Sequence, residues 1–388
     1  MRRIKNYPLP VNMKHHIACR ICSPIDLAVL LLALVGIMPG AAQARDWYPV
    51  DVDVWDPPFN TERQRVQKSY VPLEQAERRW NLCVSIPHLK DAYWLAVNFG
   101  LVDEARRLGV NLAIYEAGGY DRLEVQRKQI EECLEKGFRD SKADGLILSA
   151  ISAEGLNDLI KTTRAQGVPV LDLINGIDSP DIAARAAVDY YDDAFQIGEY
   201  LRKLAPADRD EVTVAWFPGP EGAAWVAAGD RGFNDALAGS HIRIVATKKG
   251  DTGKTAQARL IESVLDDLGE DAASKLDYIV GTTVGAEAAV GILRQRGLDQ
   301  EIKVLSYYYG PGVHRGIKRG TIIAAPTDSQ AIQARMAVDM IVRILEDKPH
   351  FKHAAPRIEV IDRNNQHDWN ASTTLAPRGF RAIFSVQE

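Results

Sequence analysis

The sequence predicts an α/β fold of two similar lobes, each built from a parallel sheet with crossover helices. One observation is size: 388 residues, 46% hydrophobic and 26% charged, suffice for two ordinary domains. A second is pattern: from Asn81 onward, short apolar runs of strand length alternate with amphipathic stretches of helical length. The third observation is the number of predicted strands, because ten strands exceed what one Rossmann-like sheet holds.

The N-terminus predicts export. Several basic residues precede an apolar run from Leu27 to Met38, and Ala42-Gln43-Ala44 follows a Pro39-Gly40 break. This is the pattern of a secretory signal peptide, residues 1–44, cleaved after Ala44. A transmembrane anchor would need roughly 18 apolar residues, and this run is shorter. We therefore expect a periplasmic protein without membrane insertion after cleavage, whose translation starts at Met1 or Met13.

Residues 45–80 form the next segment, which is rich in Trp, Pro and charged residues and shows no sustained helical or strand period. Such a segment predicts an extended arm. It either covers apolar surface as a strap or contacts a partner through its aromatic side chains.

Strand-length runs then occur in two series. The first is Leu82–Ile86, Asn111–Tyr115, Gly145–Ser149, Val168–Leu173 and Ala186–Val188; the second is Val212–Phe217, Ile242–Ala246, Tyr278–Val280, Lys303–Ser306 and Thr321–Ala325. Gly109, Gly167 and Gly297 each follow a helical stretch and precede a strand, as glycines that close helices do.

Three segments follow a strand and precede a helix, and we expect them to cross between the lobes: Asp189–Asp192, Tyr307–Gly310 and Pro326–Asp328. These hinge crossings would place residues 81–188 plus 308–325 in the first lobe and 189–307 plus 326–350 in the second, with 351–388 as a tail packing on both. A ligand would bind in the cleft between the lobes, at the carboxyl ends of the strands.

Cysteine usage predicts one disulfide. Cys19 and Cys22 leave with the signal peptide, so Cys83 and Cys133 form an even pair in an oxidising compartment. Both are expected at the edge of the first lobe that faces away from the cleft. A bond there would contribute about 4 kcal/mol to stability in the chain-entropy model.

Several function classes find no support. A net charge of −5 provides no basic surface for nucleic acid. Gly250–Thr255 resembles a phosphate-binding loop, but Lys248 stands where the motif requires glycine, so a strand-to-helix turn is expected. Dinucleotide fingerprints, zinc-binding helices and nucleophile elbows are absent from the sequence. His88 and His314, near the predicted cleft, are expected to be loop or capping residues, and we expect a binding protein without metal, cofactor or catalytic residues.

Aromatic residues gather at the ends of strands. Asp91 is the natural N-cap of the first helix, followed by Tyr93 and Trp94. Asp189-Tyr190-Tyr191 and Tyr307-Tyr308-Tyr309 lie at predicted crossings, and Trp225 follows a Pro-Gly-Pro turn. Facing rings suit either a stacked sugar or a small cationic head group, and Asp91 or Asp189 can accept a hydrogen bond or balance positive charge.

At these residues the sequence resembles the periplasmic sensing proteins for trimethylamine N-oxide (TMAO), within the type I periplasmic binding protein superfamily. The resemblance runs from part of the preceding arm to the end of the chain. It is carried by Pro72-Leu73, Ala76–Arg78, Trp80–Cys83, Pro87–Leu95, Gly109–Leu112, Glu116–Tyr120, Asp277–Gly281 and Ala325–Asp328.

The resemblance implies a cleft that holds TMAO and a partner, the periplasmic domain of a sensor histidine kinase. It also implies that Asp91, Tyr93 and Trp94 contact the ligand, that Tyr308 is a cleft tyrosine, and that Cys83 bonds Cys133. With Tyr190 at the first predicted crossing, the predicted ligand-binding residues are Asp91, Tyr93, Trp94, Tyr190 and Tyr308. One position departs from the family, because Tyr190 stands where a Trp is usual, and a Tyr ring is the weaker cation-π face. The alternative is a transport protein that delivers a sugar or small amine to an ABC permease. A periplasmic hydrolase would require a catalytic set that the sequence does not show.

Overall fold

The structure, a computed structural model, describes residues 47–139 and 141–387. The predicted signal peptide and its cleavage site lie outside the described residues. Within the described part, no helix combines the length and apolar character needed to span a membrane.

The first lobe is built on a nine-stranded sheet in the order β15-β4-β3-β5-β6-β7-β13-β1-β2. Its strands β3 to β7 and β13 run parallel, whereas β1, β2 and β15 pair antiparallel at the two edges. The strands are β1 (Val50–Trp55), β2 (Arg65–Tyr70), β3 (Asn81–Ile86), β4 (Asn111–Glu116), β5 (Gly145–Leu148), β6 (Val170–Leu173), β7 (Ala184–Ala186), β13 (His353–Pro356) and β15 (Ser385–Val386).

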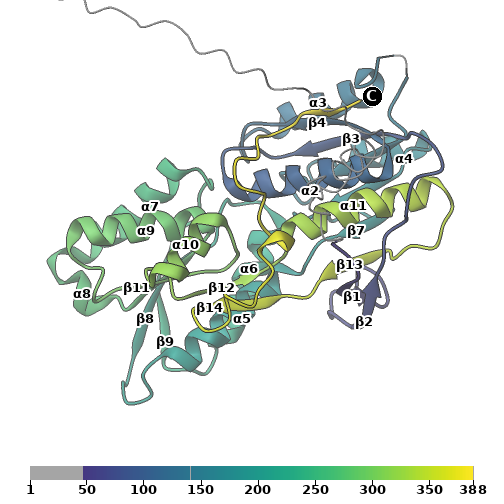
Figure 1. The fold of residues 1–388 in the computed structure, drawn as a ribbon. Coiled ribbons are helices and arrows are strands. Elements are labelled where there is room, and N and C mark those ends of the chain that lie inside the picture. The colour runs from purple at the N-terminus through teal and green to yellow at the C-terminus, as the bar shows by residue number, and fades with distance from the viewer. Residues whose placement is uncertain (1–46, 140, 388) are drawn as a thin grey trace, which may run out of the picture. The chain divides into compact units, whose positions relative to one another are not determined.

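Helices cover both faces of this sheet. Figure 1 shows α2 (Ala92–Leu108) and α11 (Gln330–Leu345) side by side, and they pack on each other and on the sheet. Their buried side chains belong to the main apolar core. Helices α3 (Leu123–Lys136) and α4 (Asn157–Ala165) contribute to a separate core against the other face.

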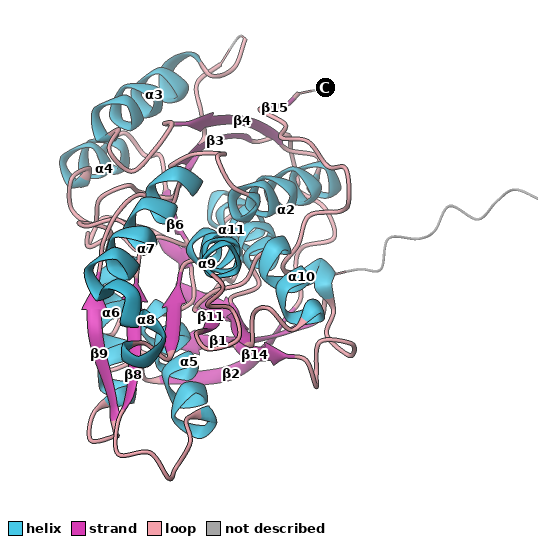
Figure 2. Ribbon diagram, turned by 90° about the vertical axis from the view of Figure 1, so that its left-hand side faces the viewer, coloured by secondary structure: helices cyan, strands magenta, loops and turns pink. Residues whose placement is uncertain are grey.

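The second lobe has a parallel four-stranded sheet in the order β11-β10-β8-β9, and the antiparallel pair β12-β14 lies next to β11. Its strands are β8 (Val212–Phe217), β9 (Ile242–Thr247), β10 (Tyr278–Gly281), β11 (Lys303–Ser306), β12 (Ala324–Thr327) and β14 (Glu359–Asp362). Its helices are α5 (Tyr190–Leu204), α6 (Ala224–Leu237), α7 (Lys254–Leu268), α8 (Ala272–Lys275), α9 (Thr283–Arg296) and α10 (Pro311–Arg319), with short 3₁₀ turns at 269–271 and 371–373. Figure 2 shows how β8 and β9 lie among these helices.

All ten predicted strands are present, most of them within two residues of the expected ends. Gly109 and Gly297 close α2 and α9 in the left-handed conformation, with φ of 74° and 70°. Gly167 follows α4 with a positive φ as well. The parallel sheets with crossover helices confirm the predicted fold class.

The C-terminal part of the chain divides between the lobes differently from our expectation. Residues 308–325 belong to the second lobe, because α10 packs on α9 and β12 pairs with β14. Helix α11, expected in the second lobe, packs on α2 in the first. The short lobe-to-lobe connections are therefore 187–189, 328–329 and 357–358, and Tyr307–Gly310 joins β11 to α10 within one lobe. The tail contains two short strands that the sequence did not predict, β13 and β14, and the third connection joins them.

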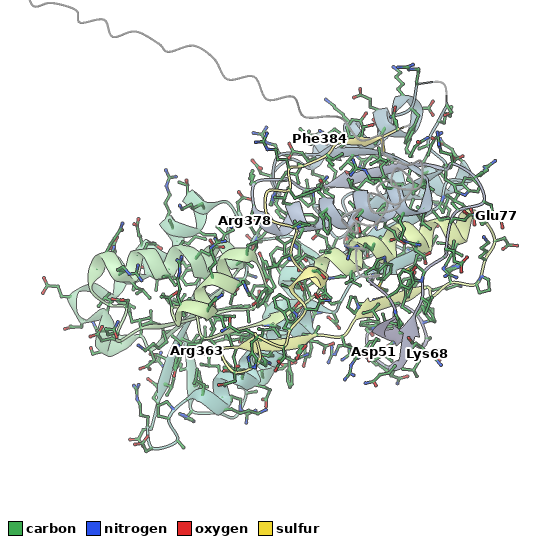
Figure 3. All side chains as sticks on the ribbon, viewed as in Figure 1. Asp51, Lys68, Glu77, Arg363, Arg378 and Phe384 are labelled. Atoms are coloured by element: carbon green, nitrogen blue, oxygen red, sulfur yellow. A yellow bond between two sulfur atoms is a disulfide. The ribbon has the colours of Figure 1, made fainter. Side chains whose placement is uncertain are left out.

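The arm is more regular than predicted, since residues 50–70 form an antiparallel hairpin, β1 and β2, at one edge of the sheet. Figure 3 labels Asp51 and Lys68 on this hairpin. Val52 and Val54 alternate with aspartates and are buried, as in a half-buried strand. Trp55 stacks on His353 at 3.9 Å between ring centroids. The hairpin thus covers apolar surface, one of the two roles expected of the arm.

Cys83 and Cys133 form a disulfide between β3 and the end of α3. Both residues are fully buried, in the core on the α3 side of the sheet. The bond closes a sequence separation of 50 residues within the first lobe.

Candidate functional site

A small pocket lies between the two lobes, and its volume open to the centre of a water molecule is about 10 Å³. This is about the room that one water molecule needs, so the side chains around the pocket pack closely. Nine residues line it, in chain order Asp91, Tyr93, Trp94, Tyr120, Asn175, Tyr190, Trp225, Thr252 and Tyr308. All five residues that we predicted from the sequence are among them.

The start of α2 positions three of these side chains. Asp91 is the N-cap, and its Oδ1 accepts hydrogen bonds from the backbone N–H groups of Tyr93 at 3.1 Å and Trp94 at 3.2 Å. The cap fixes the first turn of the helix, so both aromatic side chains are held at the pocket. Burial raises the pKa of Asp91 to about 6.

Aromatic rings form the pocket walls. Tyr308 contacts three other rings of the pocket edge to face, with centroid distances of 5.3 Å to Tyr93, 6.0 Å to Trp225 and 6.4 Å to Tyr190. Tyr120 adjoins Trp225 at 6.0 Å. We call the five rings of Tyr93, Tyr120, Tyr190, Trp225 and Tyr308, which all line the pocket, the cage.

Several hydroxyl groups of the cage are already engaged by the protein. Tyr93 donates a short hydrogen bond to Asp328, and its oxygen lies 2.7 Å from the Tyr190 hydroxyl. Tyr120 donates to Asn175 Oδ1 at 3.3 Å. By contrast, the indole Nε1 of Trp225 is buried and makes no hydrogen bond of good geometry with the described residues, although the Tyr120 hydroxyl lies close enough to interact with it. The Trp225 N–H is therefore available to donate to an oxygen atom of a ligand.

The turn before α7 closes the pocket from the second lobe. Thr252 Oγ1 lies 3.0 Å from His88 Nε2, and Lys90 pairs with Asp251 at 3.3 Å. His88 is buried beside the rings of Trp94 and Tyr120, and burial lowers its pKa to about 4. His88 is therefore neutral at neutral pH, and it joins the lobes through this hydrogen bond.

Sequence reasoning missed three lining residues, Tyr120, Asn175 and Thr252. Each is a single residue in a loop, after β4, after β6 and before α7. Thr252 belongs to the Gly250–Thr255 turn, which is a strand-to-helix turn as predicted. The position of these loops could have identified the three residues, because all three loops lie at the edge of the sheets where the aromatic clusters were expected.

Other singled-out residues lie elsewhere. Asp189 caps α5 by accepting from the Tyr191 N–H at 3.0 Å and does not line the pocket. Tyr307 donates to the carbonyl of Pro218, and His314 lies beside Tyr309 in the second lobe. Among the described residues, no cluster of His, Cys, Asp or Glu is arranged to hold a metal ion.

Comparison with known proteins places the chain in a family. Residues 82–349 match the family described as periplasmic binding protein domain. The periplasmic protein TorT of Escherichia coli K12 is 35% identical over 316 residues, which cover 81% of this chain and 87% of TorT.

Solved structures agree with this assignment. An ABC transporter solute binding protein from Bradyrhizobium sp. BTAi1, with bound bis-tris, is 48% identical with a TM-score of 0.75, covering 87% of this chain and 99% of that chain. The TorS sensor domain–TorT complex in the presence of TMAO gives 32% identity and a TM-score of 0.69, covering 79% and 99%. The chain belongs to the periplasmic binding protein family and is a relative of TorT.

Proposed function

We propose that this protein is a periplasmic sensor that binds TMAO in the aromatic pocket and signals to the periplasmic domain of a TorS-like sensor histidine kinase. The observation that carries the proposal is the combination of a cage of rings, one carboxylate and one available N–H donor. The similarity to TorT, which is found in complex with the TorS sensor domain, supports the choice of ligand and partner.

TMAO matches each part of the pocket. Its three methyl groups carry diffuse positive charge and pack on ring faces, as cationic ligands do in aromatic cages. Its oxide oxygen needs a donor, which Trp225 Nε1 supplies. Asp91 balances the positive methylated end, because a carboxylate cannot donate to the oxide. This is binding without chemistry, so the ligand should be recovered unchanged after incubation.

Titration calorimetry of residues 45–388 with TMAO tests the proposal. Trp225→Phe keeps an aromatic ring but removes the donor, so TMAO affinity should fall by about tenfold or more, the effect of losing a hydrogen bond to a charged acceptor. The affinity for tetramethylammonium, which has no oxygen, should fall much less in the same variant. Equal losses for the two ligands would remove Trp225 from the proposed role, and no TMAO binding by the unchanged protein would reject the ligand.

The second candidate function is solute delivery to an ABC permease. It is favoured by the 48% identity to the Bradyrhizobium solute binding protein, which exceeds the identity to TorT. The two functions separate in one experiment, titration with the periplasmic domain of a TorS-like kinase in the presence and absence of TMAO. Ligand-dependent binding of the kinase domain supports the sensor, whereas no kinase binding together with tight binding of a pentose or hexose supports transport.

A further inference from the structure

Two buried carboxyl groups lie behind the pocket, outside the set of lining residues. Asp193 is on the first turns of α5, one helical turn after Tyr190. Asp328 lies in the connection between β12 and α11. Both side chains are fully buried.

The hydrogen bonds of this pair are incomplete. Asp328 Oδ2 accepts from Tyr93, Tyr190 and Gln333. Its Oδ1, and both carboxyl oxygens of Asp193, have no donor among the described residues. Three buried carboxyl oxygens without donors are costly if both acids are ionised, because each charge is desolvated and they repel each other.

A single proton relieves most of this cost. Held on Asp193, it neutralises the acid that has no donor among the described residues and leaves the charge on Asp328, which accepts three hydrogen bonds. The electrostatics agree: burial, followed by the charge of Asp328, raises the pKa of Asp193 well above its ordinary value, and burial raises that of Asp328 to about 6. The other carboxylates that raise the pKa of Asp193 are Asp192 and Asp189 on the same helix.

The remaining negative charge is coupled to the cage. Because Tyr93 donates to Asp328, the Tyr190 hydroxyl must donate in turn to Tyr93 or to Asp328. Both hydroxyl protons then point toward the buried acid, and electron density is shifted into the two rings that line the pocket. A ring polarised in this way is a better partner for a cation.

We propose that Asp193 is protonated while Asp328 is ionised, and that the single charge on Asp328 is a specificity determinant, favouring ligands with a cationic end over neutral ligands of the same shape. This rests on the proposed function only in taking the cage as the ligand site. Asp193 and Asp328 act through Tyr93 and Tyr190 and are positioning residues.

The charge count gives a sharp test. Asp193→Asn keeps the ionised Asp328, whereas Asp328→Asn removes the carboxylate that accepts from both ring hydroxyls and leaves the buried Asp193 protonated. We therefore expect Asp193→Asn to bind tetramethylammonium within about threefold of the unchanged protein, and Asp328→Asn and the double variant to bind it on the order of tenfold or more weakly. Binding of tert-butanol, a neutral ligand of similar shape, should be equally weak in all four proteins. Asp121→Asn, which removes an exposed charge, is the control for net charge.

Difference infrared spectroscopy tests the proton on Asp193 without any ligand. At neutral pH, the unchanged protein should show a carbonyl band of a protonated carboxylic acid that Asp193→Asn loses and Asp91→Asn keeps. Absence of a band that depends on Asp193 overturns its protonation. A tenfold loss in Asp193→Asn, or equal binding of tetramethylammonium by Asp328→Asn and the unchanged protein, overturns the role in specificity.

The test of Asp193 and Asp328 does not require TMAO to be the ligand. If TMAO does not bind but tetramethylammonium does and the double variant loses it, the pair stands and only the proposed ligand fails. If neither methylated ligand binds the unchanged protein, the pair confers no preference for cations and the specificity proposal fails.

Discussion

Asp91 combines a structural and an electrostatic role in one side chain. One oxygen caps α2, and the carboxyl lines the pocket with a pKa raised by burial to about 6, from an ordinary value of 3.8. The carboxyls of Asp251 and Glu287 raise this pKa further. A raised carboxyl pKa favours folding fully below the unfolded value and loses that contribution as pH rises through about 6.

Ligand binding should show the opposite trend. The cationic end of TMAO favours ionised Asp91, so affinity should rise with pH through about 6 and fall below it by up to about tenfold per pH unit. Calorimetry across this range checks the slope. Asp91→Asn keeps a good N-cap and should bind weakly with a flatter profile. An unchanged slope in this variant would assign the titration to another group.

Residues also differ in how well the sequence identifies them. The aromatic clusters were predictable because they follow strands and precede helices, but only the family resemblance selected Tyr190 and Tyr308 within them. The structure brings both rings to the pocket, together with Tyr93 and Trp94. Asn175 was not predictable, because an amide after a buried strand also satisfies backbone groups. It does so here by donating to the Ala150 carbonyl at 2.8 Å. Whether any of these residues contacts a ligand remains a prediction.

At the level of elements, a close helix crossing holds one wall of the pocket. Helices α5 and α6 pack tightly, and a Cβ atom at Gly232 would lie 2.0 Å from the carbonyl oxygen of Tyr191. Gly232→Ala must therefore push the helices apart, and should destabilise the protein by about 1–3 kcal/mol. It should also weaken ligand binding, because α5 begins with Tyr190.

Gly291→Ala is the matched control. Gly291 is also inside a helix, α9, but a Cβ there meets nothing within 4 Å. The added methyl should stabilise the helix by about 0.5–1 kcal/mol, the usual gain of Ala over Gly. Denaturant unfolding measures both variants. Similar stability changes of the two would show that the crossing at Gly232 is less constrained than described.

The elements that sequence reasoning missed are short. Most parallel strands were found because they contain runs of apolar residues, whereas the parallel strand β13 contains His353 and Pro356 and the antiparallel strand β14 has four residues of mixed character. Apolar and polar residues alternate in β1, since Val50, Val52 and Val54 are separated by aspartates. We did not predict a strand there because prolines and tryptophans surround this short stretch. Without β13 and β14, the third lobe connection was assigned to Tyr307–Gly310.

At the scale of the whole molecule, the contact between His88 and Thr252 favours the closed arrangement of the lobes. A ligand that binds only the closed arrangement has an apparent affinity set by the fraction of closed protein. His88→Phe retains a ring between Trp94 and Tyr120 but removes the hydrogen bond, and should weaken TMAO binding by about fivefold.

Small-angle scattering should show this variant to be more open without ligand and equally closed at saturation. Lys90→Met breaks the exposed ion pair to Asp251 across the same gap and should change affinity by less than about twofold. If His88→Phe loses affinity but shows unchanged scattering without ligand, the effect arises inside the pocket rather than from closure.

The two edges of the nine-stranded sheet carry opposite ends of the described chain. The hairpin that begins at Val50 lies at one edge, and Val386 pairs with Leu112 at the other. Fluorophores attached near these two positions would both move with the first lobe. The energy-transfer efficiency between them would therefore stay constant while the protein opens and closes. A surface tether at either position would likewise hold only the first lobe. An optical reporter of ligand binding therefore needs one label on the second lobe, for example on the exposed face of α9.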